Sequence, residues 1–83
     1  MSDENVVRSP IPGVFYRRPD PGSPPFVSEG DVVENGAVVG LVEVMKQFHE
    51  VHSEVRGRVR SFVVDDEGVV GAGDVVAELD PAD

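Results

Sequence analysis

Valine dominates the apolar residues of this chain and restricts its fold more than any other feature. The 83 residues include nineteen valines but only one isoleucine and two leucines. Valine branches at Cβ, which disfavours helices and suits the half-buried surface of a pleated sheet. The sequence therefore predicts a small all-β domain, and its length leaves room for one hydrophobic core.

Two phrases of the sequence occur twice, which predicts that the two halves of the chain share a fold. The first phrase is Val-Val, two residues, Gly, one residue, Val-Val, which occupies 32–39 and recurs 37 positions later at 69–76. The second phrase is Ser-x-aliphatic-x-Gly, which occupies 9–13 and recurs 44 positions later at 53–57. We expect the halves to be related by a pseudo-twofold axis.

The two offsets, 37 and 44, differ by seven, so the first half contains seven residues that the second half lacks. This insertion falls in the proline-rich segment 17–26. Prolines there prevent continuation of a central strand and reduce the number of accessible loop conformers. We expect a stiff projecting loop with Phe26 at its base, and the alternative is a tolerated surface loop without a role.

Valine-rich stretches between turn residues predict eight short strands, which form a small barrel or sandwich. Asn, Asp and Gly tolerate left-handed backbone angles and indicate turns at 34–36 and 65–68. The predicted strands lie near 5–8, 13–16, 31–33, 38–44, 48–53, 58–63, 69–70 and 75–79.

The charge of the chain excludes several classes of partner. Its formal net charge of −9 would repel nucleic acid and anionic membranes. The absence of cysteine excludes disulfides, thiol nucleophiles and cysteine-bound metal sites. The acidic start resembles no signal peptide and no apolar run reaches membrane-spanning length, so we expect a cytoplasmic protein.

Lys46 is the only lysine and lies where the two repeated halves meet. An ordinary lysine is protonated at neutral pH, so its acylation needs an activated donor and a partner enzyme. Residues 45 and 46 would form the tip of a hairpin, where Asn-Gly is preferred over Met-Lys. This local conflict marks the tip as the first candidate site. The alternative is a different register, with Lys46 on an edge strand.

The sequence around this lysine resembles the biotinyl domain of biotin carboxyl carrier proteins of multi-subunit acetyl-CoA carboxylases. The family attaches biotin to the lysine of a Met-Lys pair that follows Glu-Ala, and here the segment reads Glu43-Val44-Met45-Lys46-Gln47. Lipoyl domains have Asp-Lys instead, so Met45 favours biotin. The run Ser9-Pro10-Ile11-Pro12-Gly13-Val14-Phe15-Tyr16-Arg17 resembles the family's opening, which leads into a protruding thumb loop.

The resemblance implies a single domain over 1–83, with a core at about 5–80 and the thumb at about 17–26. Its fold would be a flattened barrel-sandwich hybrid of two four-stranded antiparallel sheets. Biotin on Lys46 would carry a carboxyl group from a biotin carboxylase to a carboxyltransferase acting on an acyl-CoA, most simply acetyl-CoA in fatty acid biosynthesis. A biotin protein ligase would attach the biotin, and the chain itself would be a carrier and not an enzyme.

Three positions depart from the family pattern. Val44 replaces alanine and Gln47 replaces methionine beside the attachment lysine, which implies slower recognition by a ligase or a specialised one. Arg18 occupies the position of a threonine that can contact the ureido ring of biotin in the family. Two alternatives remain: a lipoyl carrier of a 2-oxo acid dehydrogenase or glycine-cleavage system, against which Met45 argues, and an unmodified scaffold module, which the departures at Val44 and Gln47 keep open.

Other candidate residues are interpreted as structural. His49 and His52 lie three apart on a predicted strand and point to opposite faces, which disfavours a shared metal ion, so we expect no metal site. The acidic run 65–67 is typical of a solvated turn. Phe15, Phe48 and Phe62 are expected in the core.

Overall fold

The structure, a computed structural model, describes residues 5–82 and contains eight β-strands and no helix in that range. None of these residues therefore forms a helix able to cross a membrane. Every strand lies within one residue of its predicted bounds. The strands are β1 (Val6–Arg8), β2 (Gly13–Tyr16), β3 (Val32–Val33), β4 (Val38–Val44), β5 (Gln47–His52), β6 (Gly57–Phe62), β7 (Gly68–Val70) and β8 (Val75–Asp80).

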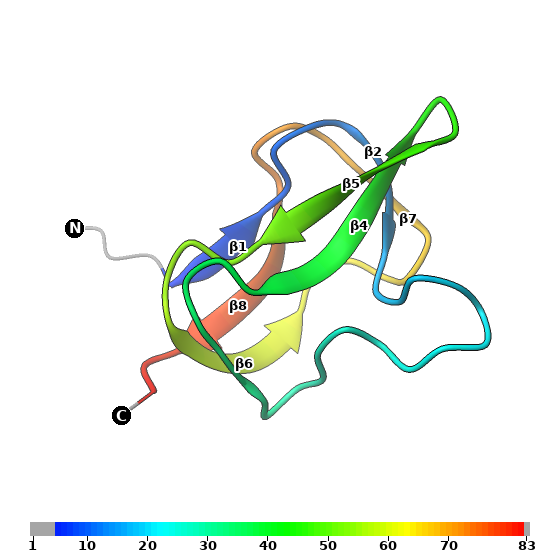
Figure 1. Cartoon of the computed structure of the whole chain (residues 1–83). Coiled ribbons are helices and arrows are strands. Elements are labelled where there is room, and N and C mark those ends of the chain that lie inside the picture. Colours follow the sequence, from blue (N-terminus) through cyan, green and yellow to red (C-terminus); the bar gives the residue numbers. More distant parts are fainter. Residues whose placement is uncertain (1–4, 83) are drawn as a thin grey trace.

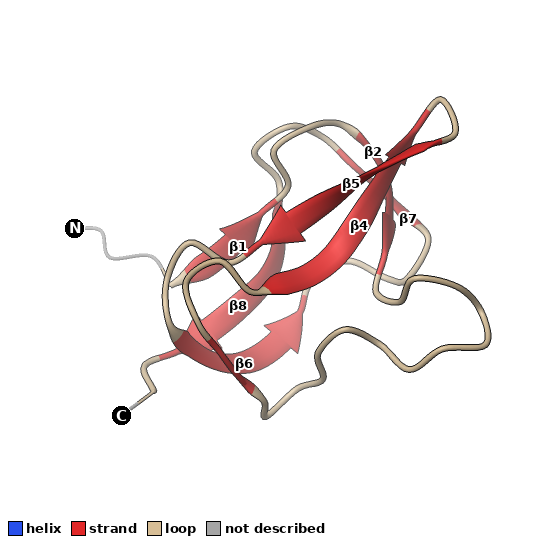
Figure 2. Cartoon of the chain, in the orientation of Figure 1, coloured by secondary structure: helices blue, strands red, loops and turns tan. Residues whose placement is uncertain are grey.

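The strands form two four-stranded antiparallel sheets, as predicted (Figure 2). One sheet has the order β1-β8-β6-β3 and the other has the order β5-β4-β2-β7. Adding 44 to the residue numbers of β1 and β2 gives positions in β5 and β6. Adding 37 to the residue numbers of β3 and β4 gives positions in β7 and β8. The repeat therefore exchanges the two sheets, which is the pseudo-twofold relation expected from the sequence.

Buried hydrogen bonds repeat between the halves as closely as the strands do. The Ser9 amide donates to the Asp74 carbonyl at 2.9 Å, and the Ser53 amide donates to the Ala37 carbonyl at 2.9 Å. The hydroxyl of each serine donates to the carbonyl two residues ahead, at 2.6 Å for Ser9 and 2.5 Å for Ser53. Because both serines are almost fully buried, these bonds satisfy polar groups that water does not reach.

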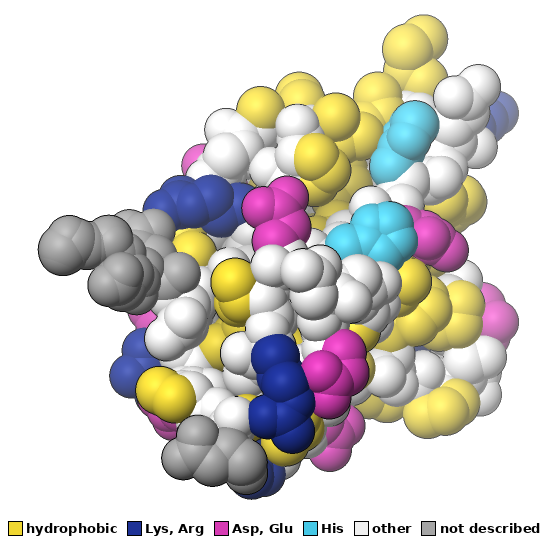
Figure 3. Space-filling model, turned by 60° about the vertical axis from the view of Figure 1, so that its left-hand side comes forward, with side chains coloured by type: hydrophobic (Ala, Val, Ile, Leu, Met, Phe, Trp, Pro, Cys, Tyr) yellow, Lys and Arg dark blue, Asp and Glu magenta, His cyan; other side chains and the backbone are white. Residues whose placement is uncertain are grey.

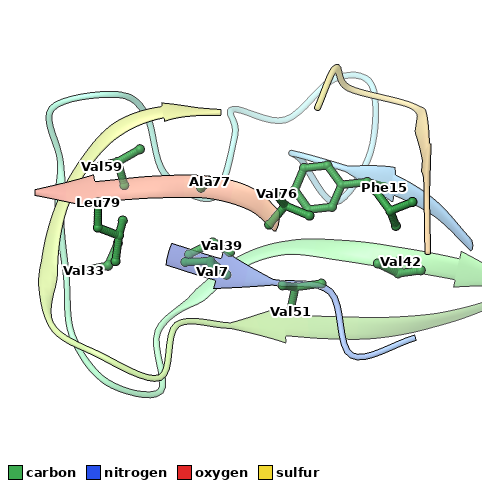
Figure 4. Close-up of a cluster of buried hydrophobic side chains, with 11 residues drawn as sticks. Val7, Phe15, Val33, Val39, Val42, Val51, Val59, Val76, Ala77 and Leu79 are labelled. Atoms are coloured by element: carbon green, nitrogen blue, oxygen red, sulfur yellow. The ribbon is translucent and has the colours of Figure 1, made fainter. Parts of the chain in front are cut away.

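The hydrophobic core lies between the sheets and consists almost entirely of symmetry-related pairs (Figure 4). Five pairs contribute one side chain from each half, and Ala77 corresponds to Gly40. The pairs are Val7 with Val51, Phe15 with Val59, Val33 with Val70, Val39 with Val76 and Val42 with Leu79.

One core pair is unequal in size, and a glycine compensates for it. Phe15 is much larger than its counterpart Val59, and a Cβ placed on Gly40 would come within 2.5 Å of the Phe15 ring. The other half has the smaller Val59 and tolerates Ala77 at the equivalent position. The large Phe15 is thus combined with Gly40 in one half, and the smaller Val59 with Ala77 in the other, so both halves of the core are filled.

The long loop between β2 and β3 projects from the side of the molecule (Figure 1). Its base is closed by a hydrogen bond of 2.9 Å from the Phe26 amide to the Arg17 carbonyl. Farther out, the Asp20 carboxylate accepts hydrogen bonds from the Gly22 amide and the Ser23 hydroxyl. These bonds hold the segment predicted as a projecting loop in a defined shape.

We predict that Gly40→Ala is destabilising by about 1–3 kcal/mol, because the added methyl group overpacks the Phe15 ring. Phe15→Val alone should also destabilise, because it leaves a cavity. The double variant reproduces the Val59 and Ala77 arrangement of the other half and should recover much of the loss. Chemical denaturation of the three variants measures this coupling, and strictly additive losses would contradict it.

Candidate functional site

The β4–β5 hairpin ends in a two-residue turn formed by Met45 and Lys46, as predicted. Val44 pairs with Gln47 at the last rung of the ladder, which leaves only these two residues in the turn. Their φ angles are 52° and 69°, so both lie in the left-handed region. This is the pattern of a type I′ hairpin turn, which normally uses Asn and Gly.

The turn is strained and exposed. A non-glycine residue in the left-handed region costs roughly 1–2 kcal/mol, so the Met-Lys pair is retained against its backbone preference. Met45 is 91% exposed and Lys46 is also exposed. No carboxylate of residues 5–82 forms an ion pair with the Lys46 amine. The hairpin projects from the body of the molecule, and apolar side chains extend to that end (Figures 1 and 3).

Tyr16 connects the two arms of this hairpin below the turn. Its hydroxyl donates a hydrogen bond of 2.9 Å to the Glu43 carboxylate on β4. Its ring contacts the Phe48 ring on β5, with 6.0 Å between the ring centroids. Glu43 and Phe48 face each other across the ladder, so Tyr16 contacts one residue of each arm. The hydrogen bond to Glu43, together with partial desolvation, raises the pKa of the Tyr16 hydroxyl above its ordinary value of 10.0.

A cleft lies between the hairpin and the projecting β2–β3 loop. Its volume of about 460 Å³ is within the range of small-ligand pockets, about 300–1,000 Å³. Arg18 lines it with a side chain that is 37% exposed and lies 3.8 Å from the Asp66 carboxylate. The Arg18 Nε atom has no hydrogen-bond partner among residues 5–82. The lining residues are Tyr16, Arg18, Pro19, Asp20, Pro21, Phe48, Asp66 and Glu67.

The structure brings the sequence-predicted site residues to two neighbouring places. Glu43 and Val44 end β4, Gln47 begins β5, and the turn lies between them. Arg18 lies apart from the turn, at the cleft.

The sequence analysis did not identify Tyr16 as a site residue, although it is the only tyrosine of the chain. It also misplaced Phe48, which was expected in the core. Phe48 is 55% exposed because it lies on the outer face of the sheet, while Phe15 is fully buried. Phe62 is partly buried against the core.

The two histidines do not form part of a metal centre in the described range. The His52 imidazole lies 3.0 Å from the Glu50 carboxylate, and both side chains are exposed. Within residues 5–82, no three His, Asp or Glu side chains are arranged to hold a metal ion. Both histidines are visible on the surface in Figure 3.

Comparison with known proteins relates this fold and hairpin to biotin-dependent enzymes. A family model described as "Biotin-requiring enzyme" matches residues 5–79. The biotin carboxyl carrier protein of acetyl-CoA carboxylase 1 from Arabidopsis thaliana chloroplasts is 47% identical over 61 residues, which cover 74% of this chain and 22% of that protein. The biotin carboxyl carrier protein of acetyl-CoA carboxylase from Pseudomonas aeruginosa is 43% identical over 61 residues, covering 74% and 39%.

Among solved structures, urea carboxylase from Kluyveromyces lactis superposes with a TM-score of 0.75 at 29% identity. The match covers 95% of this chain and 6% of the larger enzyme. The chain thus spans less than half of each of these three relatives.

Replacing Met45-Lys46 by Asn-Gly should stabilise the fold by about 1–2 kcal/mol, because Asn and Gly adopt left-handed angles at lower cost. Thermal unfolding would show a melting temperature raised by several degrees. Glu67→Gly is the matched control, because Glu67 is the third non-glycine residue at positive φ among those described, at 71°. It should raise the melting temperature by about half as much. An unchanged value for the Asn-Gly variant would contradict the turn geometry.

Titration of Tyr16 should give a pKa above 10.0, and Glu43→Gln should lower it towards that value because the charged acceptor is removed. The folded protein favours the neutral phenol, so this contribution to stability is present below pH 10 and lost as the pH rises through the folded pKa. Near-ultraviolet absorbance measures the titration cleanly, since the chain has one tyrosine and no tryptophan. Glu54→Gln, away from the hairpin, should leave the titration unchanged. Identical titrations for wild type and Glu43→Gln would rule out the hydrogen bond in solution.

Proposed function

The chain belongs to the family of biotin-requiring enzymes, and from this membership and the hairpin geometry we propose that it is a biotin carrier with Lys46 as the attachment residue. The observation that carries the proposal is the exposed Met45-Lys46 turn, retained with both residues at positive φ. A hairpin tip selected only for stability would contain Asn or Gly there. The strain is therefore explained by a requirement for these two side chains at the outermost point of the sheet.

The residues of the hairpin fit a covalently attached group. The Lys46 amine is exposed and unpaired within residues 5–82, so a ligase and an activated acyl donor can reach it. Paired strands support the turn up to Val44 and Gln47, which holds the amine at a fixed place on the body. When bound, biotin supplies a ureido nitrogen that accepts and releases a carboxyl group. The chain supplies reach and recognition, so its role is that of a non-catalytic carrier.

The partners follow from the same proposal. Carrier proteins named for acetyl-CoA carboxylase are among the relatives, which supports a biotin carboxylase and a carboxyltransferase acting on an acyl-CoA as the two enzymes served. A biotin protein ligase would be the third partner. Tethering raises the effective concentration of the carried group at both active sites, so weak and reversible contacts are enough.

We assign Arg18 and the cleft a secondary role in holding the carried group near the body. The guanidinium lines a space bounded by the Tyr16 and Phe48 rings, which suits the flat ureido ring of biotin. Arginine donates readily to a carbonyl oxygen, so Arg18 can replace the hydroxyl donor expected at this position in the family.

Intact mass of the protein purified from its native host tests the assignment. We expect one biotinyl group per chain, and Lys46→Arg should abolish the increment while preserving the positive charge and the fold. A lipoyl increment would favour a lipoyl carrier, and an unmodified mass would favour a scaffold module. A biotinyl increment that survives Lys46→Arg would disprove the choice of Lys46.

A further inference from the structure

The pseudo-twofold relation allows the hairpin end of the molecule to be compared with its equivalent in the other half. This equivalent, which contains Arg60 and Asp80, is called the far end. Applying the repeat offsets to Tyr16 and Glu43 leads to Arg60 and Asp80. Both pairs are in contact: the Tyr16 hydroxyl lies 2.9 Å from the Glu43 carboxylate, and the Arg60 guanidinium lies 3.4 Å from the Asp80 carboxylate. The same structural position therefore has an acid in both halves, but only the far end provides a cation for it.

This difference leaves Glu43 with an uncompensated charge. Arg60 pairs with Asp80 and also with Glu78, at 3.3 Å, so its cation offsets the negative charge of that end. Glu43 accepts a hydrogen bond from a neutral hydroxyl, and no Arg, Lys or His of residues 5–82 forms an ion pair with it. Tyr16 thus fixes the orientation of the carboxylate and leaves its charge intact.

One cross-strand neighbour of Glu43 is also less polar than the equivalent neighbour of Asp80. The two cross-strand neighbours of Glu43 are Val14 and Phe48. At the far end, the residue that faces Asp80 in place of Val14 is Arg58. A carboxylate flanked by apolar side chains is less screened than one among other charges, so its attraction for a cation on a partner is stronger.

We propose that Tyr16 is a positioning residue that presents the Glu43 carboxylate, still charged, to a basic side chain of the enzyme that biotinylates Lys46. This inference rests on the proposed function, because it concerns recognition of the same hairpin. Glu43 lies three residues before Lys46, within reach of an enzyme whose active site holds the amine. Tyrosine is suited to this role, because an arginine at position 16 would neutralise the acid as Arg60 neutralises Asp80.

The test is the rate of biotinylation of the full-length, unmodified chain by a purified biotin protein ligase, with biotin and ATP. Tyr16→Phe keeps the ring and loses the hydrogen bond, and it should raise KM for the carrier a few-fold with kcat unchanged. Tyr16→Arg installs the ion pair of the far end and should raise KM by roughly tenfold, the size expected for loss of a charged contact at an interface. The matched control is Arg60→Tyr, which changes the equivalent position far from Lys46 and should leave KM unchanged.

Two further measurements separate recognition from a purely structural role. The KM of the wild type should rise with salt concentration, and that of Tyr16→Arg should respond much less. In a Glu43→Gln background, Tyr16→Arg should cause little further rise in KM, because the charge it would neutralise is already absent. Thermal unfolding identifies any variant that fails to fold. If Tyr16→Arg does not fold, the KM values of the single variants Tyr16→Phe and Glu43→Gln provide the test, and unchanged values in both would contradict the inference.

The outcomes distinguish this inference from the proposed function. A wild-type chain that accepts biotin, with a Tyr16→Arg variant of unchanged KM and salt response, would overturn the role of Tyr16 and leave Lys46 as the carrier residue. Equal effects of Tyr16→Arg with and without Glu43 would also overturn it. A wild-type chain that no ligase modifies, and that carries no biotin in its native host, would overturn the proposed function itself.

Discussion

Burial of paired valines between the two sheets is the interaction on which the rest of the structure depends. Each fully buried valine contributes about 1.5–3 kcal/mol, and the chain has no cysteine to add covalent support. The core includes Val42 on β4 and Val51 on β5, so the hairpin is anchored where its strands cross the body. On its outer rungs the β5 side chains are exposed, whereas Val44 on β4 is half-buried and packs against the core, and the backbone ladder and Tyr16 add further support. Stability is concentrated in the body, and the strained turn lies at the end of the ladder.

This separation explains how one short hairpin combines rigidity with access. The left-handed angles at Met45 and Lys46 cost free energy that the body must supply, and the turn does not relax into a looser loop because Val44 and Gln47 remain paired. The contacts of Tyr16 with Glu43 and Phe48 restrict both arms near the turn. Such an arrangement suits the proposed carrier role, in which an attached group would swing while its anchor point stays fixed.

The strands, the internal repeat and the turn at 45–46 could be predicted because each depends on a pattern of neighbouring residues in the sequence. Valine between turn residues indicates a strand, and shared spacing of valine and glycine indicates a repeat. Phe48 was misplaced because the predicted burial followed residue type, while its actual exposure depends on which face of β5 it occupies. The Tyr16–Glu43 contact joins residues 27 positions apart on neighbouring strands, and its significance emerges only by comparison with Arg60 and Asp80. The Arg18–Asp66 contact likewise depends on how two loops meet.

The strand pairing also places the two ends of the fold beside each other. The Leu79 amide donates to the Asn5 carbonyl at 2.8 Å, so the start of β1 and the end of β8 are adjacent at the side opposite the hairpin (Figure 1). By the pseudo-twofold axis, this junction is the structural equivalent of the lysine turn. A circular permutant with a short linker here and new termini at 45–46 would keep every strand pair. The same strand framework could therefore present a lysine turn at either pole, because the two poles differ in their loops and not in their strand pairing.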